Sequence, residues 1–182
     1  MQLRMSARVL AAAGALALAT VVSSCGFDYA TDRVYTPGAG VNERDSSVGV
    51  LGAVIVSAQE GSGTLVASFA NNSETDPATV STIAGSGDDA DVTATDFQPI
   101  QIKPGGLVNL ATDGGVVLTG KGVSSGALVT LAIAFGDGES VTMDIPVVPP
   151  CHEYEGLDTS GDGSGTTDEC TVESPDATAS TE

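Results

Sequence analysis

The feature that most constrains the fold is a strict alternation of large apolar residues with smaller or polar ones. It runs from Val129 to Phe135 and again from Val141 to Val147. Successive side chains of a β-strand point to opposite faces, so both segments predict strands with one buried face. Gly136-Asp137-Gly138 between them has the composition of a tight turn, which predicts a hairpin. Pro146 and Pro149-Pro150 favour an edge position for the second strand, because proline cannot donate to a ladder.

Shorter segments of the same kind precede this hairpin. Residues 48–56 and 64–70 predict a first hairpin that ends at Asn71-Asn72, and weaker strands are expected at 78–84, 91–95, 99–103 and 107–110. Trp is absent and aromatic residues make up only 4% of the chain, which suits thin strands joined by short turns. Seven to nine short strands with regular turn signals predict an all-β, immunoglobulin-like β-sandwich over residues 48–149.

The first 24 residues have the parts of a secretory signal peptide. Arg4 and Arg8 precede the apolar segment Val9–Val22, whose fourteen residues are too short to favour a permanent membrane span. Val22-Ser23-Ser24-Cys25 resembles a bacterial lipobox with Val in place of the usual Leu. It predicts that Cys25 becomes the N-terminus and carries lipid chains such as palmitate. The alternative is an ordinary signal peptide followed by an incidental cysteine.

Cleavage before Cys25 would leave an acidic protein held at the outer face of the cell membrane. Residues 25–47 show no periodicity and predict an extended linker. The full chain carries six basic and 24 acidic residues, and the signal peptide holds two of the basic ones and none of the acids. This charge argues against nucleic acid as a partner. It leaves the membrane, through the lipid, and an unknown envelope protein or ligand as expected partners.

Residues 150–182 predict an acidic tail that is disordered or tied locally. In an oxidising compartment, Cys151 and Cys170 would most simply form a disulfide, although free thiols and an intermolecular bond remain alternatives. Between them, the spacing of Asp158, Ser160, Asp162 and Glu169 matches a calcium-binding loop, with Gly163 at the turn position. A chance match in a Gly- and Asp-rich tail is the alternative reading.

The chain lacks the residues for common catalytic sets. His152 is the only histidine, and no G-x-S-x-G motif, phosphate-binding loop or paired CxxC is present. The sequence therefore predicts a protein that is not an enzyme and has no catalytic residues. It predicts no cofactor apart from calcium.

Two segments resemble a known family. Ile102–Leu110 with its diglycine, followed by Gly114-Gly115 and the final hairpin, is similar to PCuAC, the extracytoplasmic copper(I) chaperone family. The similarity extends to actinobacterial lipoproteins of the LpqE type, which carry this domain behind a lipobox. The resemblance covers residues 48–149 and implies a cupredoxin-like β-sandwich.

The resemblance also implies where copper(I) ligands would stand. In the family, a His-x-Met follows the second diglycine, but Val117 and Thr119 occupy those positions here. Residues 88–98 supply neither His nor Met, and Met143 is expected to pack in the core. Copper(I) requires thioether, thiolate or imidazole donors.

We therefore expect a lipid-anchored binding or structural module without copper ligands. The alternatives are a metal-delivery chaperone that uses other ligands, such as His152 and the cysteines, and a calcium-tied adhesion module.

Overall fold

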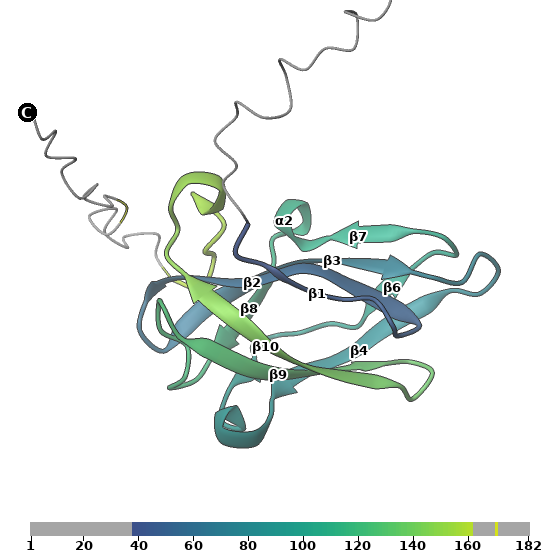
Figure 1. Cartoon of the computed structure of the whole chain (residues 1–182), viewed down its shortest axis with the longest axis horizontal. Helices are drawn as coiled ribbons and strands as arrows, with labels where there is room; N and C mark the ends of the chain where they lie inside the picture. The colour runs from purple at the N-terminus through teal and green to yellow at the C-terminus, as the bar shows by residue number, and fades with distance from the viewer. Residues whose placement is uncertain (1–37, 162–169, 171–182) are drawn as a thin grey trace, which may run out of the picture. The chain divides into compact units, whose positions relative to one another are not determined.

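A computed structural model describes residues 38–161 and residue 170 of the chain. These residues form ten strands, one short helix and two 3-10 turns (Figure 1). None of the described helices has the length and apolar character that crossing a membrane requires. The strands are β1 Val41–Glu43, β2 Val48–Gln59, β3 Ser62–Asn71, β4 Ala78–Gly85, β5 Thr93–Ala94, β6 Ile100–Ile102, β7 Leu107–Asn109, β8 Val116–Thr119, β9 Leu128–Phe135 and β10 Ser140–Val148; the helix is α2 Leu110–Asp113, and the turns are Gly87–Asp89 and His152–Tyr154.

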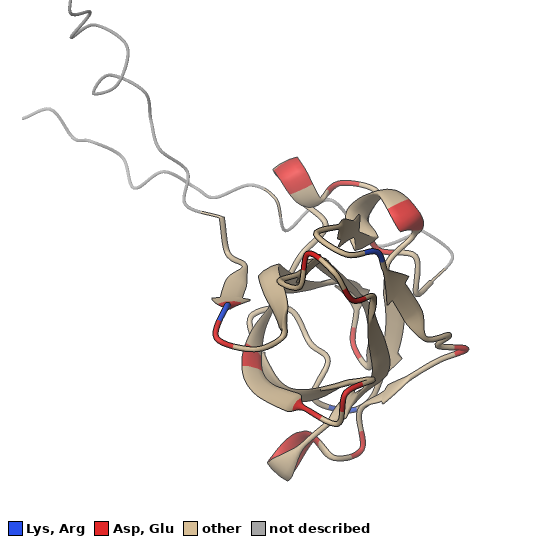
Figure 2. Cartoon of the chain, turned by 90° about the vertical axis from the view of Figure 1, so that its right-hand side faces the viewer, with Lys and Arg blue, Asp and Glu red and all other residues tan. Residues whose placement is uncertain are grey.

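Seven of the described strands close into a ring, which Figure 2 shows end-on. The order around the ring is β2-β10-β9-β4-β5-β8-β3, and a pairing between β3 and β2 completes it. The strands β1, β6 and β7 pair outside the ring with β2, β4 and β3. The pairings are antiparallel except that between β10 and β2. The predicted all-β, sandwich-like class is therefore confirmed for the described residues.

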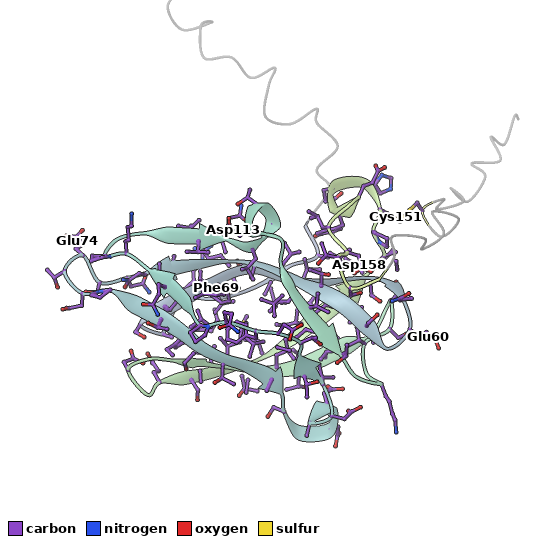
Figure 3. All side chains as sticks on the ribbon, turned by 180° about the vertical axis from the view of Figure 1, so that it is seen from behind. Glu60, Phe69, Glu74, Asp113, Cys151 and Asp158 are labelled. Carbon is purple, nitrogen blue, oxygen red and sulfur yellow. A yellow bond between two sulfur atoms is a disulfide. The ribbon has the colours of Figure 1, made fainter. Side chains whose placement is uncertain are left out.

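The alternation that predicted the last hairpin fills the inside of the ring. Every second residue of β9, from Val129 to Phe135, is at most 3% exposed, and Met143, Ile145 and Val147 of β10 join the same cluster. Phe69 of β3 and the other large apolar side chains complete the core (Figure 3). The expectation that Met143 packs in the core is confirmed.

The expected edge position of the last strand is wrong. The strand β10 lies between β9 and β2. Of its residues, Val147 and Val148 pair with β2, opposite Ile55 and Val56. Pro146 comes immediately before this paired stretch. A proline is therefore tolerated in an internal strand because most of β10 has a neighbour on one side only.

The folded domain extends beyond both predicted boundaries, 47/48 and 149/150. The strand β1 lies within the range predicted as linker and pairs with β2. Beyond β10, Tyr154 and Leu157 pack against Val54 and Val56 on the outer face of the sheet, within the range predicted as a largely disordered tail. These apolar residues stand singly in polar sequence, so no periodicity identified them.

Candidate functional site

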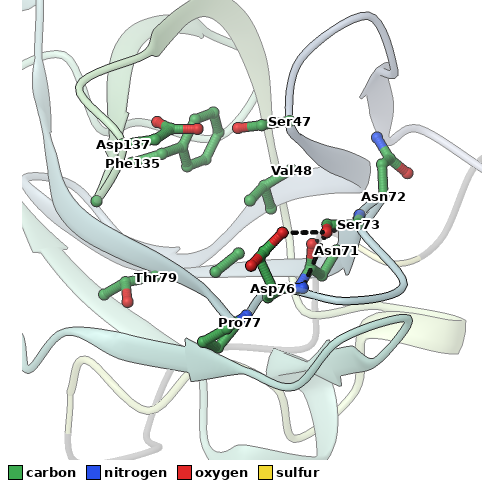
Figure 4. Close-up of a pocket in the computed structure, with 12 residues that line it drawn as sticks. Ser47, Val48, Asn71, Asn72, Ser73, Asp76, Pro77, Thr79, Phe135 and Asp137 are labelled. Atoms are coloured by element: carbon green, nitrogen blue, oxygen red, sulfur yellow. Dashed lines mark hydrogen bonds between the residues drawn. The ribbon is translucent and has the colours of Figure 1, made fainter.

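A groove of about 590 Å³ opens at one end of the ring (Figure 4). Four chain segments meet there: the entry to β2, the β3–β4 loop, the start of β4 and the β9–β10 turn. Polar side chains from these segments surround an apolar floor, an arrangement typical of binding sites. The lining residues are Ser47, Val48, Asn71, Asn72, Ser73, Asp76, Pro77, Ala78, Thr79, Phe135, Gly136 and Asp137.

The tight turn between β9 and β10 places one carboxylate at the groove. Gly138 adopts a φ of 91°, a conformation that L side chains rarely adopt, and its N–H donates to the Phe135 carbonyl. The Asp137 carboxylate accepts a hydrogen bond from the Glu139 N–H through Oδ1, at 2.9 Å. Asp137 is exposed. The Gly-Asp-Gly sequence thus fixes both the turn and the direction of its acidic side chain.

Asn71 at the end of β3 shapes the opposite wall. Its side chain is 6% exposed, and its amide nitrogen donates to the carbonyls of Asp76 (2.8 Å) and Lys103 (3.1 Å). Its side-chain oxygen accepts from the Ser73 N–H at 2.9 Å. These bonds hold the β3–β4 loop, so that the exposed Asp76 carboxylate faces the groove (Figure 4). Asp76 accepts from the Thr75 hydroxyl at 2.9 Å through Oδ2.

Ser47 joins the two walls. Its N–H donates to the Glu139 carboxylate at 2.8 Å, and its carbonyl accepts from the Asn72 N–H at 3.1 Å. Its hydroxyl oxygen is buried and has no hydrogen bond of normal geometry among the described residues. It faces Asp137 (Figure 4). The Ser47 hydroxyl and the Glu139 N–H favour the charged form of Asp137 and hold the pKa of this carboxyl below its ordinary value.

The positions at which the PCuAC family would have copper ligands lie elsewhere on the ring. Val117 and Thr119 belong to β8, which pairs with β3 on one side and with β5 on the other. Thr119 is opposite Thr93, and their hydroxyl oxygens are 3.3 Å apart. A valine and two threonines offer copper(I) no soft donor, so the residues present do not fit that metal. Within residues 38–161 and 170, His, Cys, Asp and Glu form no group of three that could hold a metal ion.

The structure brings some of the predicted tail residues together. Cys151 and Cys170 form a disulfide, with their Cα atoms 5.4 Å apart. His152 is exposed beside it. Of the predicted calcium ligands, Asp158 and Ser160 are described, whereas Asp162 and Glu169 lie outside the described residues, as does the predicted lipidation site Cys25.

Both carboxylate oxygens of Asp158 are occupied by protein donors. Oδ2 accepts from the Ala58 N–H of β2 at 2.7 Å, and Oδ1 accepts from the buried Thr64 hydroxyl of β3 at 3.1 Å. Oδ1 also accepts from the Ser160 N–H and hydroxyl, at 2.9 and 2.6 Å. The Thr159 N–H in turn donates to the Thr64 hydroxyl at 2.7 Å. The residue predicted as a calcium ligand therefore fastens the C-terminal segment to the ring.

Sequence reasoning missed the groove. It recognised Asn71-Asn72 and Gly136-Asp137-Gly138 as turns, but it did not predict that these turns meet. Binding residues are often carried on loops that a rigid scaffold positions. The available signal for the groove was two acids between predicted strands: Asp76, between 64–70 and 78–84, and Asp137, in the turn of the last hairpin. Their meeting at one end depends on closure of the ring, which no local pattern encodes.

The fold defines the class of protein as a small all-β domain with a loop-built groove. No protein-family model and no curated protein matches the chain. Among solved structures, the chain is similar to the copper-bound PCuAC domain from PmoF2, with 18% identity and a TM-score of 0.49 over 60% of this chain and 99% of that one. It is also similar to the apo PCuAC domains from PmoF2 and PmoF1, each with 16% identity over 60% of this chain, with TM-scores of 0.48 and 0.49 over 96% and 100% of those domains. At this level of similarity, the copper site of those domains does not carry over to this chain.

Proposed function

We propose that the chain is a non-enzymatic, lipid-anchored cell-envelope protein of the LpqE type, whose PCuAC-like domain binds a ligand other than copper(I). The observation that carries the proposal is the groove at the end of the ring. It combines an apolar floor with several polar groups held in place by the loops, as ligand sites do. The ligand site is thus assigned to the loops between strands, and the lipid on Cys25 keeps the domain at the membrane.

The groove assignment is tested by occluding it. Pro77 is exposed at the groove and precedes β4, so Pro77→Trp adds a bulky side chain without removing a backbone donor. Pro99 is also exposed and precedes β6, but does not line the groove, which makes Pro99→Trp a matched control. Each full-length lipidated variant is used as bait in cross-linking on intact envelopes. A component captured by wild type and Pro99→Trp but lost with Pro77→Trp supports the proposal; equal capture by all three contradicts it.

The lipid anchor requires a separate experiment. Cys25→Ala removes the only residue of the lipobox that can carry the lipid. We expect this variant to be released from the membrane fraction or to keep an uncut signal peptide. Mass spectrometry of the N-terminal peptide and membrane fractionation measure both outcomes. Retention of a correctly processed Cys25→Ala protein in the membrane would show that the anchor is something else.

A copper-delivery role would have to use donors outside the ring. His152 is exposed, whereas Cys151 and Cys170 are joined in a disulfide and cannot offer thiolates while it is intact. Copper(I) titration of the oxidised protein should therefore show no stoichiometric binding. One tightly bound copper(I) per chain, lost on His152→Ala, would instead favour the chaperone role.

A further inference from the structure

We propose that the groove binds an organic cation that carries N–H donors, above all the guanidinium group of an arginine side chain. The inference rests on the proposed function of the groove as the ligand site and assigns the chemical class of its ligand. Asp76 and Asp137 supply the acceptors, and Ser47 supplies a third polar group.

The two carboxylates reach the groove from different walls and keep unused acceptors. Asp76 belongs to the β3–β4 loop, where the Thr75 hydroxyl bonds to its Oδ2. Asp137 belongs to the β9–β10 turn, where the Glu139 N–H bonds to its Oδ1. No hydrogen bond of normal geometry from the described residues reaches Oδ1 of Asp76 or Oδ2 of Asp137, and the Ser47 hydroxyl faces Asp137. One oxygen on each wall is therefore available to a donor placed in the groove (Figure 4).

Ser47 adds a polar group to the groove beside Asp137. Its hydroxyl oxygen is buried at the lining of the groove and faces the Asp137 carboxylate, without a hydrogen bond of normal geometry in the described part of the chain. A donor-rich ligand between the walls can donate to this oxygen as well as to the two carboxylates.

The composition of the groove selects positive charge. The lining residues include two acids and no Lys, Arg or His, so a phosphate or carboxylate ligand would be repelled. The exposed Pro77 and the partly buried Ala78 add an apolar surface that suits an alkyl stem, above the buried Val48 and Phe135. A guanidinium presents five N–H donors in a planar fork and is less strongly hydrated than an ammonium. It can therefore donate in several directions while its stem lies on the floor.

The test uses the processed, lipidated protein in detergent micelles. N-acetyl-arginine methylamide, its neutral citrulline counterpart and spermidine are titrated by calorimetry and followed by amide NMR shifts. We expect the arginine probe to bind, to shift the Ser47, Asp76 and Asp137 amides, and to weaken as salt is added. We expect Asp76→Asn and Asp137→Asn each to weaken it by roughly tenfold, the order of one charge-assisted hydrogen bond.

Glu60→Gln is the charge-matched control. Glu60 lies at the β2–β3 turn, at the other end of the ring from Glu74 in the groove-forming loop (Figure 3). Glu60→Gln should leave the affinity for the arginine probe unchanged. Because all three acids are exposed, melting temperatures close to that of wild type will show that the variants fold.

Each outcome decides the inference. If spermidine binds more tightly than the arginine probe and depends equally on Asp76 and Asp137, the cation site is supported. The ligand is then a free polyamine and not an arginine side chain. Equal binding of the arginine and citrulline probes overturns it, as does a Glu60→Gln effect equal to that of the groove variants. If no probe binds while Pro77→Trp still loses its envelope partner, the cation is wrong and the proposed function stands. If Pro77→Trp loses nothing, the proposed function itself fails.

Discussion

Replacing Asp158 by alanine should lower the free energy of unfolding by about 2 kcal/mol. The carboxylate accepts one hydrogen bond from the Ala58 N–H of β2 and one from the Thr64 hydroxyl of β3. Hydrogen bonds to charged groups contribute about 1.5–3 kcal/mol when well shielded. Asp158 is half-buried, so solvent screening reduces each to about 1 kcal/mol. Two such bonds give the stated total, and the Thr64 hydroxyl keeps Thr159 as a partner.

The assay is urea and thermal unfolding followed by circular dichroism near pH 7. A loss of 2 kcal/mol corresponds to a fall in the melting temperature of about 8 °C for a domain of this size. Glu155→Ala is the matched control, because this acid is exposed in the same segment and its side chain makes no hydrogen bond among the described residues. It should change the stability by less than about 0.5 kcal/mol.

A double-mutant cycle isolates the contact itself. Thr64→Val removes the hydroxyl that donates to Asp158 and keeps the shape of the side chain. If the two groups interact, Asp158→Ala combined with Thr64→Val should cost about 1 kcal/mol less than the sum of the single changes. Strict additivity, or an Asp158→Ala stability equal to that of Glu155→Ala, would refute the reasoning that this carboxylate fastens the C-terminal segment.

Three other predictions concern the disulfide, acid sensitivity and the core. Cys151→Ser opens a loop of about 20 residues and should cost about 3 kcal/mol in the chain-entropy model; equal melting of the oxidised and reduced wild type would contradict it. The Ser46 hydroxyl and then the Asp45 N–H lower the pKa of Glu43, so its contribution is present above its unfolded pKa and is lost as pH falls through the folded one. Unfolding curves between about pH 6 and 3 should therefore show a smaller loss for Glu43→Gln than for wild type, and equal losses would count against the interaction. Phe69→Ala at a fully buried site should cost about 3–5 kcal/mol in urea unfolding; a loss below about 1 kcal/mol would mean that the core re-forms around it.

The strands that sequence predicted best have a strong local signal. In β9 and β10 the period of two persists over eight and nine residues, and the structure buries the expected faces. The strand β8 was missed because four residues, Val116–Thr119, between glycines carry too short a pattern. The edge assignment of β10 failed for a different reason. Which strand becomes a neighbour is decided by closure of the whole sheet, and a proline excludes a ladder bond only at its own position.

The candidate site was less accessible to sequence reasoning than the fold. The groove joins Ser47, Asp76 and Asp137, which are separated by about 30 and 60 residues along the chain. Each occurs in a turn-rich segment and, taken alone, resembles any polar side chain exposed to solvent. The calcium-like motif shows how a local pattern can omit contacts made at long range. Asp158 has the spacing of a calcium ligand, yet its carboxylate accepts hydrogen bonds from β2 and β3.

The hydrogen bonds of Asp158 predict how the protein responds to calcium. Oδ1 of Asp158 already accepts from the Thr64 hydroxyl and from Ser160, and Oδ2 accepts from the Ala58 N–H, so calcium would compete with these donors for the carboxylate. Any binding energy is then reduced by the cost of releasing these donors, and the Thr64 hydroxyl is buried. Millimolar calcium should therefore leave the wild-type melting temperature unchanged and should leave the Ala58 and Thr64 amide NMR shifts where they are. A rise in melting temperature with movement of both amides would show that the loop binds calcium and that the C-terminal segment rearranges to allow it.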